Sequence, residues 1–209
     1  MSDAASAYPV SLQVDYPDRD LNALTTAFRI ILIVPIAVIL VLISGPGGGS
    51  GSDAGKFPFL AGGVLFLPTV LMLLFRQKYP RWWFDWNVNL AKFSLRVAAY
   101  FALLNDVYPS SDEEQTVHLQ VRYPDVKKEL KAGLPLIKWF LAIPHYVVLA
   151  FLFIGVIGVV IISWFVIIVT GRYPRPFFNF VVGVMRWGVR VNGYAFLLVT
   201  DIYPPFSLK

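Results

Sequence analysis

An eight-residue opening occurs twice in this chain of 209 residues. Residues 11–18 read SLQVDYPD, and residues 118–125 read HLQVRYPD. Each opening is followed, in the same order, by a basic residue, a proline six positions later, a Tyr-Pro-Arg tripeptide and an Asp-x-Tyr-Pro ending. These landmarks are Arg29, Pro35, 79–81 and 106–109 in the first half, and Lys138, Pro144, 173–175 and 201–204 in the second. Four landmarks in one order predict an internal duplication, with a first repeat at 1–110 and a second at 111–209.

The composition of the chain is that of a membrane protein. Apolar residues make up 57% of the chain and charged residues only 15%, whereas soluble globular domains carry about 25% charged residues. The absence of cysteine excludes disulfides and thiolate metal sites. Residues 1–10 contain neither a basic region nor an apolar run, so we expect no cleavable signal peptide.

Three apolar stretches, at residues 28–43, 57–75 and 134–170, are the candidate membrane spans. A hydrocarbon core about 30 Å thick needs roughly 20 helical residues, so the third stretch is long enough for two spans with a turn near residues 155–158. We expect four transmembrane helices in two hairpins, with a flexible Gly-rich loop at residues 45–53 in the first hairpin. Arg29 would reach the headgroups by snorkelling. A re-entrant hairpin is the alternative for the short first span.

Each repeat opens with strict alternation of apolar and polar residues, over 10–16 and 117–123, which is typical of a half-buried strand. The repeat ends, at residues 100–104 and 194–199, are aromatic and aliphatic. We therefore expect a small cytoplasmic sheet in which the repeat openings pair with the repeat ends.

The segments 81–97 and 175–191 have the pattern of amphipathic helices, with an apolar, tryptophan-containing face and a polar, basic stripe beside it. Such helices lie in the membrane interface, where cations attract anionic lipid. The candidate lipid-binding residues are Lys92, Arg96, Arg186, Arg190, Trp82, Trp86 and Trp187. A solvated or ion-paired stripe is the alternative. The predicted fold class is an all-α membrane protein with minor β structure: four transmembrane helices, two interfacial amphipathic helices and a small sheet.

The distribution of basic residues predicts the orientation. Of 18 Lys and Arg residues, only Lys56 lies in a loop between paired spans. The others lie on the face that carries both termini, which the positive-inside rule assigns to the cytoplasm. We expect a multi-pass protein of the bacterial cytoplasmic membrane with both termini in the cytoplasm.

The residue pattern favours neither catalysis nor metal binding. His118 and His145 have no second His or Glu at ligand spacing, so we expect no metal site; His145 is interpreted as a helix-packing histidine bonded to a carbonyl. The Gly-rich segment lacks the Gly-Lys-Ser/Thr ending of a phosphate loop. Asp106 and Asp201 each precede a Tyr-Pro turn, which an aspartate can cap. We expect no catalytic residue and no cofactor, and lean against an enzyme.

The segment 170–180, TGRYPRPFFNF, is followed by Arg186, Arg190, Tyr194, Leu197 and residues 201–206, DIYPPF. This part of the chain resembles bacterial membrane proteins of the domain-of-unknown-function 4389 family, and the first half is similar to a second copy. The resemblance implies two membrane spans, a Thr-Gly turn, a lateral helix and a Pro-Phe ending per unit. The first half departs from this pattern, with residues 76–78 in place of Thr-Gly and 109–110 in place of Pro-Phe. The resemblance implies no activity.

The leading functional hypothesis is a non-enzymatic accessory or scaffold subunit that engages anionic lipid and a protein partner or a second copy of itself. We expect no nucleic acid partner, because the aromatic residues lie on the membrane-facing side of the basic stripes. One alternative is an oligomeric channel or transporter component, although the spans offer few polar residues, only Thr69, His145 and Ser163. The other is a lipid-acting membrane enzyme, which would need Asp106 or Asp201 beside a second reactive group.

Overall fold

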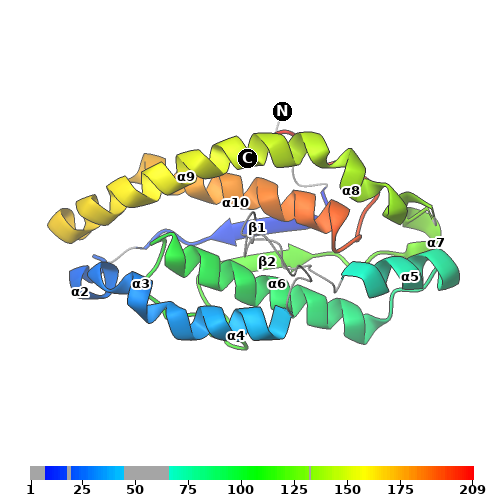
Figure 1. The fold of residues 1–209 in the computed structure, drawn as a ribbon, viewed down its shortest axis with the longest axis horizontal. Helices are drawn as coiled ribbons and strands as arrows, with labels where there is room; N and C mark the ends of the chain where they lie inside the picture. The colour runs from blue at the N-terminus through cyan, green and yellow to red at the C-terminus, as the bar shows by residue number, and fades with distance from the viewer. Residues whose placement is uncertain (1–7, 18–19, 45–65, 132) are drawn as a thin grey trace, which may run out of the picture.

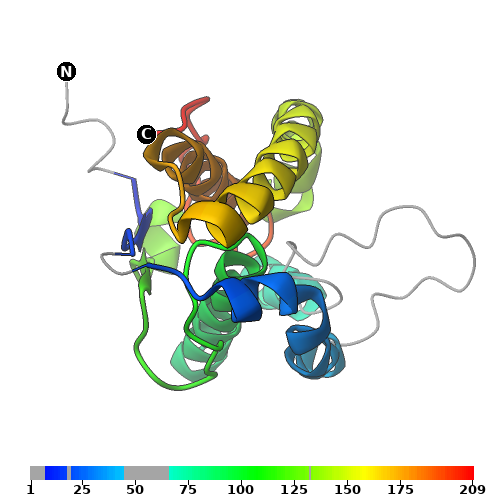
Figure 2. The same cartoon turned by 90° about the vertical axis from the view of Figure 1, so that its left-hand side faces the viewer.

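The computed structural model describes residues 8–17, 20–44, 66–131 and 133–209. The chain is mostly helical, with one small sheet, and its main elements form three layers (Figures 1 and 2). The sheet lies on one side, two long amphipathic helices lie in the middle, and apolar helices lie on the far side. The sheet consists of β1 (Val10–Val14) and β2 (Val117–Val121). The middle layer consists of α6 (Arg81–Phe101) and α10 (Arg175–Ala195), and the far layer includes α9 (Ile143–Thr170) and α4 (Val34–Ser44).

The sheet joins the two repeat openings to each other. β1 and β2 are antiparallel, with Val10 opposite Val121 and Val14 opposite Val117. The predicted alternation is confirmed in β1, where Val10, Leu12 and Val14 are buried and the residues between them are exposed. The predicted pairing with the repeat ends is wrong, because residues 100–104 and 194–199 are helix ends and turns. At those turns Leu103 and Leu198 both take a positive φ, 64° and 56°.

The two helices predicted at 81–97 and 175–191 are present, and each extends four residues further. Both begin directly after a proline, Pro80 or Pro174, at the N-cap position. α10 packs on β1, whereas α6 packs on β2. Each strand therefore covers the long helix of the other half, so the two halves share one core of buried apolar residues.

α9 is one continuous helix of 28 residues, so the turn predicted near residues 155–158 is wrong. Gly155 and Gly158 both lie within it, and an isolated glycine costs a helix only about 1 kcal/mol relative to alanine. The Phe180 ring of α10 lies 3.4 Å from the position that a Cβ of Gly155 would occupy. Gly155 thus serves close helix packing. The helix ends at Gly171, which has a φ of 71°.

The first half contains shorter apolar helices. Residues 28–43 form α3 (Arg29–Leu32) and α4, preceded by α2 (Ala23–Ala27), and α5 (Phe66–Arg76) covers the end of the predicted second span. The predicted loop at 45–53 and the start of that span lie outside the described residues. Pro35 lies in the first turn of α4, where the missing N–H is tolerated.

Short helical turns precede and begin the apolar stretch predicted at 134–170. They are α7 (Val126–Glu129), a 3-10 turn at Leu134–Leu136 and α8 (Lys138–Leu141), and they lead into α9. Within the described part of the chain, α9 alone is long and apolar enough to cross a membrane. The expectation of four spans is therefore corrected to one candidate helix, because the other apolar stretches are divided into shorter helices or lie partly outside the described ranges.

Candidate functional site

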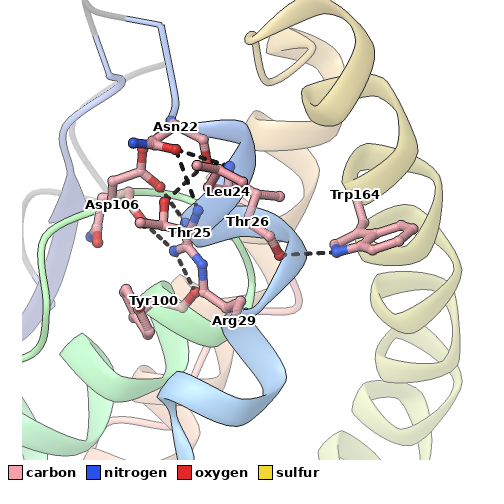
Figure 3. Close-up of polar contacts among 9 residues, drawn as sticks. Asn22, Leu24, Thr25, Thr26, Arg29, Tyr100, Asp106 and Trp164 are labelled. Atoms are coloured by element: carbon pink, nitrogen blue, oxygen red, sulfur yellow. Dashed lines mark hydrogen bonds and ion pairs between the residues drawn. The ribbon is translucent and has the colours of Figure 1, made fainter.

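A buried cation meets a partly buried carboxylate where α3 begins (Figure 3). Arg29 is only 2% exposed, and its Nη2 donates to Asp106 Oδ1. Its Nη1 donates to the carbonyl oxygens of Tyr100, at 3.0 Å, and Asn105. The guanidinium carbon lies 4.2 Å from the centre of the Tyr100 ring. Protein acceptors and an aromatic face thus surround this cation, which we call the first cation site.

The carboxylate of the first cation site also holds the start of α2. Asp106 Oδ2 accepts a hydrogen bond from the backbone N–H of Asn22 at 2.6 Å. The Asn22 side chain in turn caps α2 by accepting from Leu24 N at 2.9 Å. Three residues before Arg29, in α2, Thr26 O accepts a hydrogen bond from Trp164 Nε1 of α9 at 3.0 Å. The site therefore connects the first half to the outer helix of the second.

The second half contains an equivalent arrangement, which we call the second cation site. Lys138 is fully buried, and its Nζ lies 2.7 Å from Asp201 Oδ1. Nζ also donates to Thr200 O at 2.7 Å and lies 5.3 Å from the centre of the Tyr194 ring. Asp201 Oδ2 accepts from the backbone N–H of Lys131 at 2.8 Å. Both sites thus combine a cation, a carboxylate, a carbonyl preceding that carboxylate, an aromatic ring and a distant backbone N–H.

Burial governs the electrostatics of the second cation site. Desolvation lowers the pKa of Lys138, and the hydrogen bond and charge of Asp201 oppose that shift. The ammonium is therefore stabilised by one specific carboxylate rather than by solvent. In the first cation site, burial raises the pKa of Tyr100, against the lowering effect of Arg29.

These contacts correct two interpretations of the sequence. Arg29 does not snorkel towards headgroups, because its side chain points into the protein and ends on Asp106. The carboxylates of Asp106 and Asp201 bind backbone N–H groups far away in the sequence, at Asn22 and Lys131. The sequence showed both partners of each pair as repeated landmarks. It gave no sign that they touch, because 77 residues separate Arg29 from Asp106.

Tyrosines form a second matched set of contacts between the halves. Tyr16 Oη donates to Tyr173 O at 2.6 Å, and Tyr123 Oη donates to Tyr79 O. The guanidinium of Arg175 lies over the Tyr16 ring at 4.5 Å, and that of Arg81 lies over the Tyr123 ring at 4.7 Å. In both cases the opening of one half binds the Tyr-Pro-Arg landmark of the other. The landmark residues thus meet across the two halves.

Three of the four predicted lipid-binding cations bind backbone carbonyls. Arg96 Nη1 donates to Ser110 O at 2.9 Å, and Arg186 Nε donates to Leu12 O in β1 at 3.0 Å. Arg190 donates to Ser207 O at 2.9 Å and to Lys209 O. Arg96 and Arg190 are buried, and Arg186 is half-buried, as is Lys92. These arginines hold the β1 strand and the ends of both halves on α6 and α10.

The predicted tryptophans occupy different environments. Trp82 is 68% exposed and Trp86 is 37% exposed on α6, where Trp86 stacks on Trp83. Trp187 is buried on α10, and its Nε1 donates to His145 Nδ1 at 3.1 Å. The expected carbonyl partner of His145 is therefore replaced by an indole N–H. The imidazole also stacks on the Phe206 ring at 3.9 Å between centroids, so it fixes the Pro-Phe ending against α9.

Across the described ranges, no three His, Cys, Asp or Glu residues are grouped so that they could hold a metal ion. The polar groups that the structure brings together are instead bonded to one another. Arg29 and Lys138 each bind a carboxylate and a backbone carbonyl, and each of these carboxylates also binds the backbone N–H of a distant segment.

Comparison with known proteins gives one match. Residues 135–207 match the family described as Domain of unknown function (DUF4389). The match contains Lys138 and Asp201 of the second cation site, together with α9 and α10, and lies within the second half of the chain. No curated protein and no solved structure matches the chain significantly.

Proposed function

We propose that this chain is a non-enzymatic integral protein of the bacterial cytoplasmic membrane that acts as an accessory or scaffold subunit. The observation that carries the proposal is the apolar surface of α9. This helix contains no charged residue along 28 positions, and only 17% of its most apolar window is buried. Phe151 and Val169 are exposed by 72% and 84%. Such a surface is stable in lipid, because the transfer of apolar side chains from water to an apolar environment is favourable.

The first half supplies a second apolar surface beside α9. Ile30, Ile31 and Leu42 are exposed on α3 and α4, and Figure 2 shows these helices on the same side of the molecule as α9. We call α9, α3 and α4 together the outer layer. A surface this large exceeds what single exposed apolar residues would explain.

The scaffold role is supported by how the polar residues are used. Both cation sites, the tyrosine contacts and the arginine contacts all bind the chain to itself. Such contacts stabilise a rigid shape that presents the outer layer to lipid and the sheet to water. The proposed partners are membrane lipids and a protein subunit, which can be a second copy of the chain.

We also propose that the two halves arose by duplication of one unit. The support is the recurrence of the same contacts in both halves: cation to carboxylate, cation over an aromatic ring, and opening tyrosine to a Tyr-Pro-Arg carbonyl. Chance recurrence would need every one of these side chains to converge separately.

The two ends of the described chain, Tyr8 and Lys209, support a location on one side of the membrane for both. Tyr8 Oη donates to Arg190 O, and Arg190 Nη2 donates to Lys209 O. Both ends therefore meet at one residue of α10. Of the 18 Lys and Arg residues, only Lys56 lies in a predicted loop between spans, and this excess elsewhere favours the cytoplasm for this side.

Anionic lipid binding is proposed for the part of α6 that carries the exposed Trp82 and Trp86 and the half-buried Lys92. Trp82 and Trp86 provide aromatic surface of the kind found at membrane interfaces, and Lys92 is a cation on the same helix. Arg96, Arg186 and Arg190, in contrast, are bonded to carbonyls, so we assign them to structure.

Membrane extraction tests the main proposal. The protein is expressed in a bacterial host, and its membranes are washed with alkaline carbonate, which removes peripheral proteins. We expect the protein to stay in the membrane pellet and to need detergent for release. Recovery in the carbonate supernatant, in a folded form, would contradict an integral membrane protein.

Native mass spectrometry tests the lipid assignment. The double variant Lys92→Gln with Trp82→Ala should retain less anionic lipid than the wild type, with little change in melting temperature. Arg96→Gln is the matched control one turn away: it should lower the melting temperature because Ser110 O loses its donor, and should leave lipid retention unchanged. Equal lipid retention in the double variant and the wild type would remove α6 as the binding surface.

A further inference from the structure

We infer that the protein lies in one leaflet of the bilayer, with α9 along the membrane plane and the sheet in water, rather than crossing the membrane with α9. The outer layer is the surface of the protein that contacts the membrane, and it contacts the acyl chains of the lipid. This inference rests on the proposed membrane function and specifies its geometry.

The strands and the long helices all lie along one common axis. In Figure 1, β1, β2, α6, α10 and α9 all run along the long axis of the molecule. β1 packs on α10, and α10 packs on α9, so the strands and the outer helix are two parallel layers of one body. If α9 stood perpendicular to the membrane, the sheet would stand beside it at the same depth.

The sheet does not tolerate that depth. In the described part of the chain it consists of β1 and β2 alone, so each strand has one edge without a neighbouring strand. Open sheet edges do not occur in the hydrocarbon region, because their N–H and C=O groups would have no partner there.

The outer face of the sheet is also polar. Ser11 and Gln13 are exposed on β1, and Gln120 is exposed on β2. Asp15, which is 48% exposed, lies 3.0 Å from the His118 ring. A crossing orientation would place these groups among acyl chains, whereas an in-plane orientation leaves them in the cytoplasm.

The outer layer is apolar, unlike the outer face of the sheet, and it lies on the other side of the molecule. Its exposed side chains are aliphatic or aromatic, among them Ile31, Leu42, Phe151, Ile161 and Phe165. Figure 2 shows α9 and α4 on the side away from the sheet. One face of the molecule is therefore suited to lipid and the other to water, as in proteins that lie in the interface.

The length of α9 agrees with this geometry. At 1.5 Å per residue its 28 residues extend about 42 Å, which exceeds a hydrocarbon core about 30 Å thick. A helix in the membrane plane needs no match to that thickness. Exposed basic residues lie on both sides of the helix in the sequence, Lys128 on α7, which leads into α9 through α8, and Arg172 two residues after α9 ends. In the in-plane orientation both face headgroups of the same leaflet.

Two cysteines, one on α7 before α9 and one directly after α9, distinguish the two orientations. The chain has no cysteine of its own. Lys128→Cys and Arg172→Cys are introduced separately at exposed positions, 82% and 77% exposed, whose ion pairs lie at the surface. Gln13→Cys on β1 is the matched control for the water-facing side. Right-side-out and inside-out membrane vesicles are treated with an impermeant maleimide, and detergent-solubilised protein gives the full reactivity of each site.

We expect all three cysteines to react in inside-out vesicles and none to react in right-side-out vesicles. Reaction of Lys128→Cys and Arg172→Cys from opposite sides would overturn the in-plane orientation and leave the membrane function intact. Protection of both in both kinds of vesicle, with reaction in detergent, would also overturn it, because both ends would be embedded. Protein absent from the vesicles but folded in the soluble fraction would instead refute the proposed function itself.

Discussion

At the residue scale, the fold depends on two cations that are shielded from water and neutralised by one carboxylate each. Arg29 and Lys138 were visible in the sequence as repeated basic residues, and Asp106 and Asp201 as repeated acidic ones. Their pairing could not be predicted, because apolar surroundings in the sequence suggest a snorkelling cation as readily as a buried one. The structure selects burial, with each aspartate also binding a distant backbone N–H.

Replacement of the paired aspartates should destabilise the protein strongly. Asp106→Asn keeps an acceptor for Asn22 N but leaves Arg29 without its countercharge, and removal of one partner of a buried ion pair costs about 3 kcal/mol. Asp201→Asn should do the same through Lys138. Thermal unfolding in detergent measures the effect. Asp85→Asn, which breaks the exposed pair with Arg81, is the control and should change stability by less than about 1 kcal/mol. Equal melting temperatures for Asp106→Asn and Asp85→Asn would refute the structural role.

Buried tyrosines should make the protein sensitive to alkali. Burial raises the pKa values of Tyr8, Tyr79 and Tyr173 above their ordinary value. Their contribution to stability is complete below the unfolded pKa of about 10 and is lost as the pH rises above it. Lys138 acts with the opposite sign, because its pKa is lowered, but the three tyrosines outnumber it.

The pH dependence of the melting temperature between about pH 9 and pH 11 checks this prediction. Tyr8→Phe is the informative variant, because it removes one ionisable group and only two hydrogen bonds of 3.3 Å. It should reduce the loss of folding stability with rising pH by up to about 1.4 kcal/mol per pH unit. A variant with the same alkaline slope as the wild type would show that Tyr8 does not titrate with unfolding.

At the element scale, periodicity predicted which segments are helices and which are strands, but it did not predict which elements pack on one another. The 3.6-residue pattern at 81–97 and 175–191 predicted α6 and α10, and the two-residue pattern predicted β1 and β2. A pattern of this kind gives the buried face of an element but not the neighbour that covers it. The strand pairing was therefore wrong. The turn predicted within 134–170 was wrong for a different reason: a uniformly apolar stretch has no period, so the count of spans depended on length alone.

The packing of β1 on α10 requires a residue without a side chain. A Cβ on Gly193 would lie 2.7 Å from Val10 Cγ2, so Gly193→Ala should cost about 1–3 kcal/mol through overpacking. Val10→Ala removes that methyl group, and the double variant should be more stable than the sum of the two single changes predicts, by about 1 kcal/mol.

Gly158→Ala on α9 is the control for the Gly193 variant. No atom lies within 4 Å of its added Cβ, so alanine should be neutral or stabilising by up to about 1 kcal/mol. Thermal unfolding of the four variants measures all of these effects. Strict additivity of Gly193→Ala and Val10→Ala would contradict the contact between β1 and α10.

At the scale of the whole molecule, composition predicted a membrane protein, and the structure has one helix long and apolar enough to cross a membrane within its described ranges. The order of the landmarks predicted an internal duplication, which stays a prediction. The sequence could not show that the halves exchange strands, because that depends on contacts such as Tyr16 to Tyr173 and Tyr123 to Tyr79. The repeat boundary at residues 110–111 stays a prediction. The layered arrangement, with polar strands on one side and apolar helices on the other, follows only from the folded chain.

A depth measurement along α9 tests the central claim that the outer layer lies in lipid while the sheet lies in water. Spin labels are attached to Val147→Cys, Ile154→Cys and Ile161→Cys, three exposed positions on one face of α9, and to Gln13→Cys on β1. Accessibility to oxygen and to a water-soluble nickel complex then gives the depth of each label in bilayers.

We predict that the three α9 labels have the same lipid-exposed depth and that Gln13→Cys is accessible to nickel. If α9 crossed the membrane, Val147→Cys and Ile154→Cys would differ in depth by about 10 Å, at 1.5 Å per residue. That gradient, or full nickel accessibility at all three α9 positions, would contradict the account.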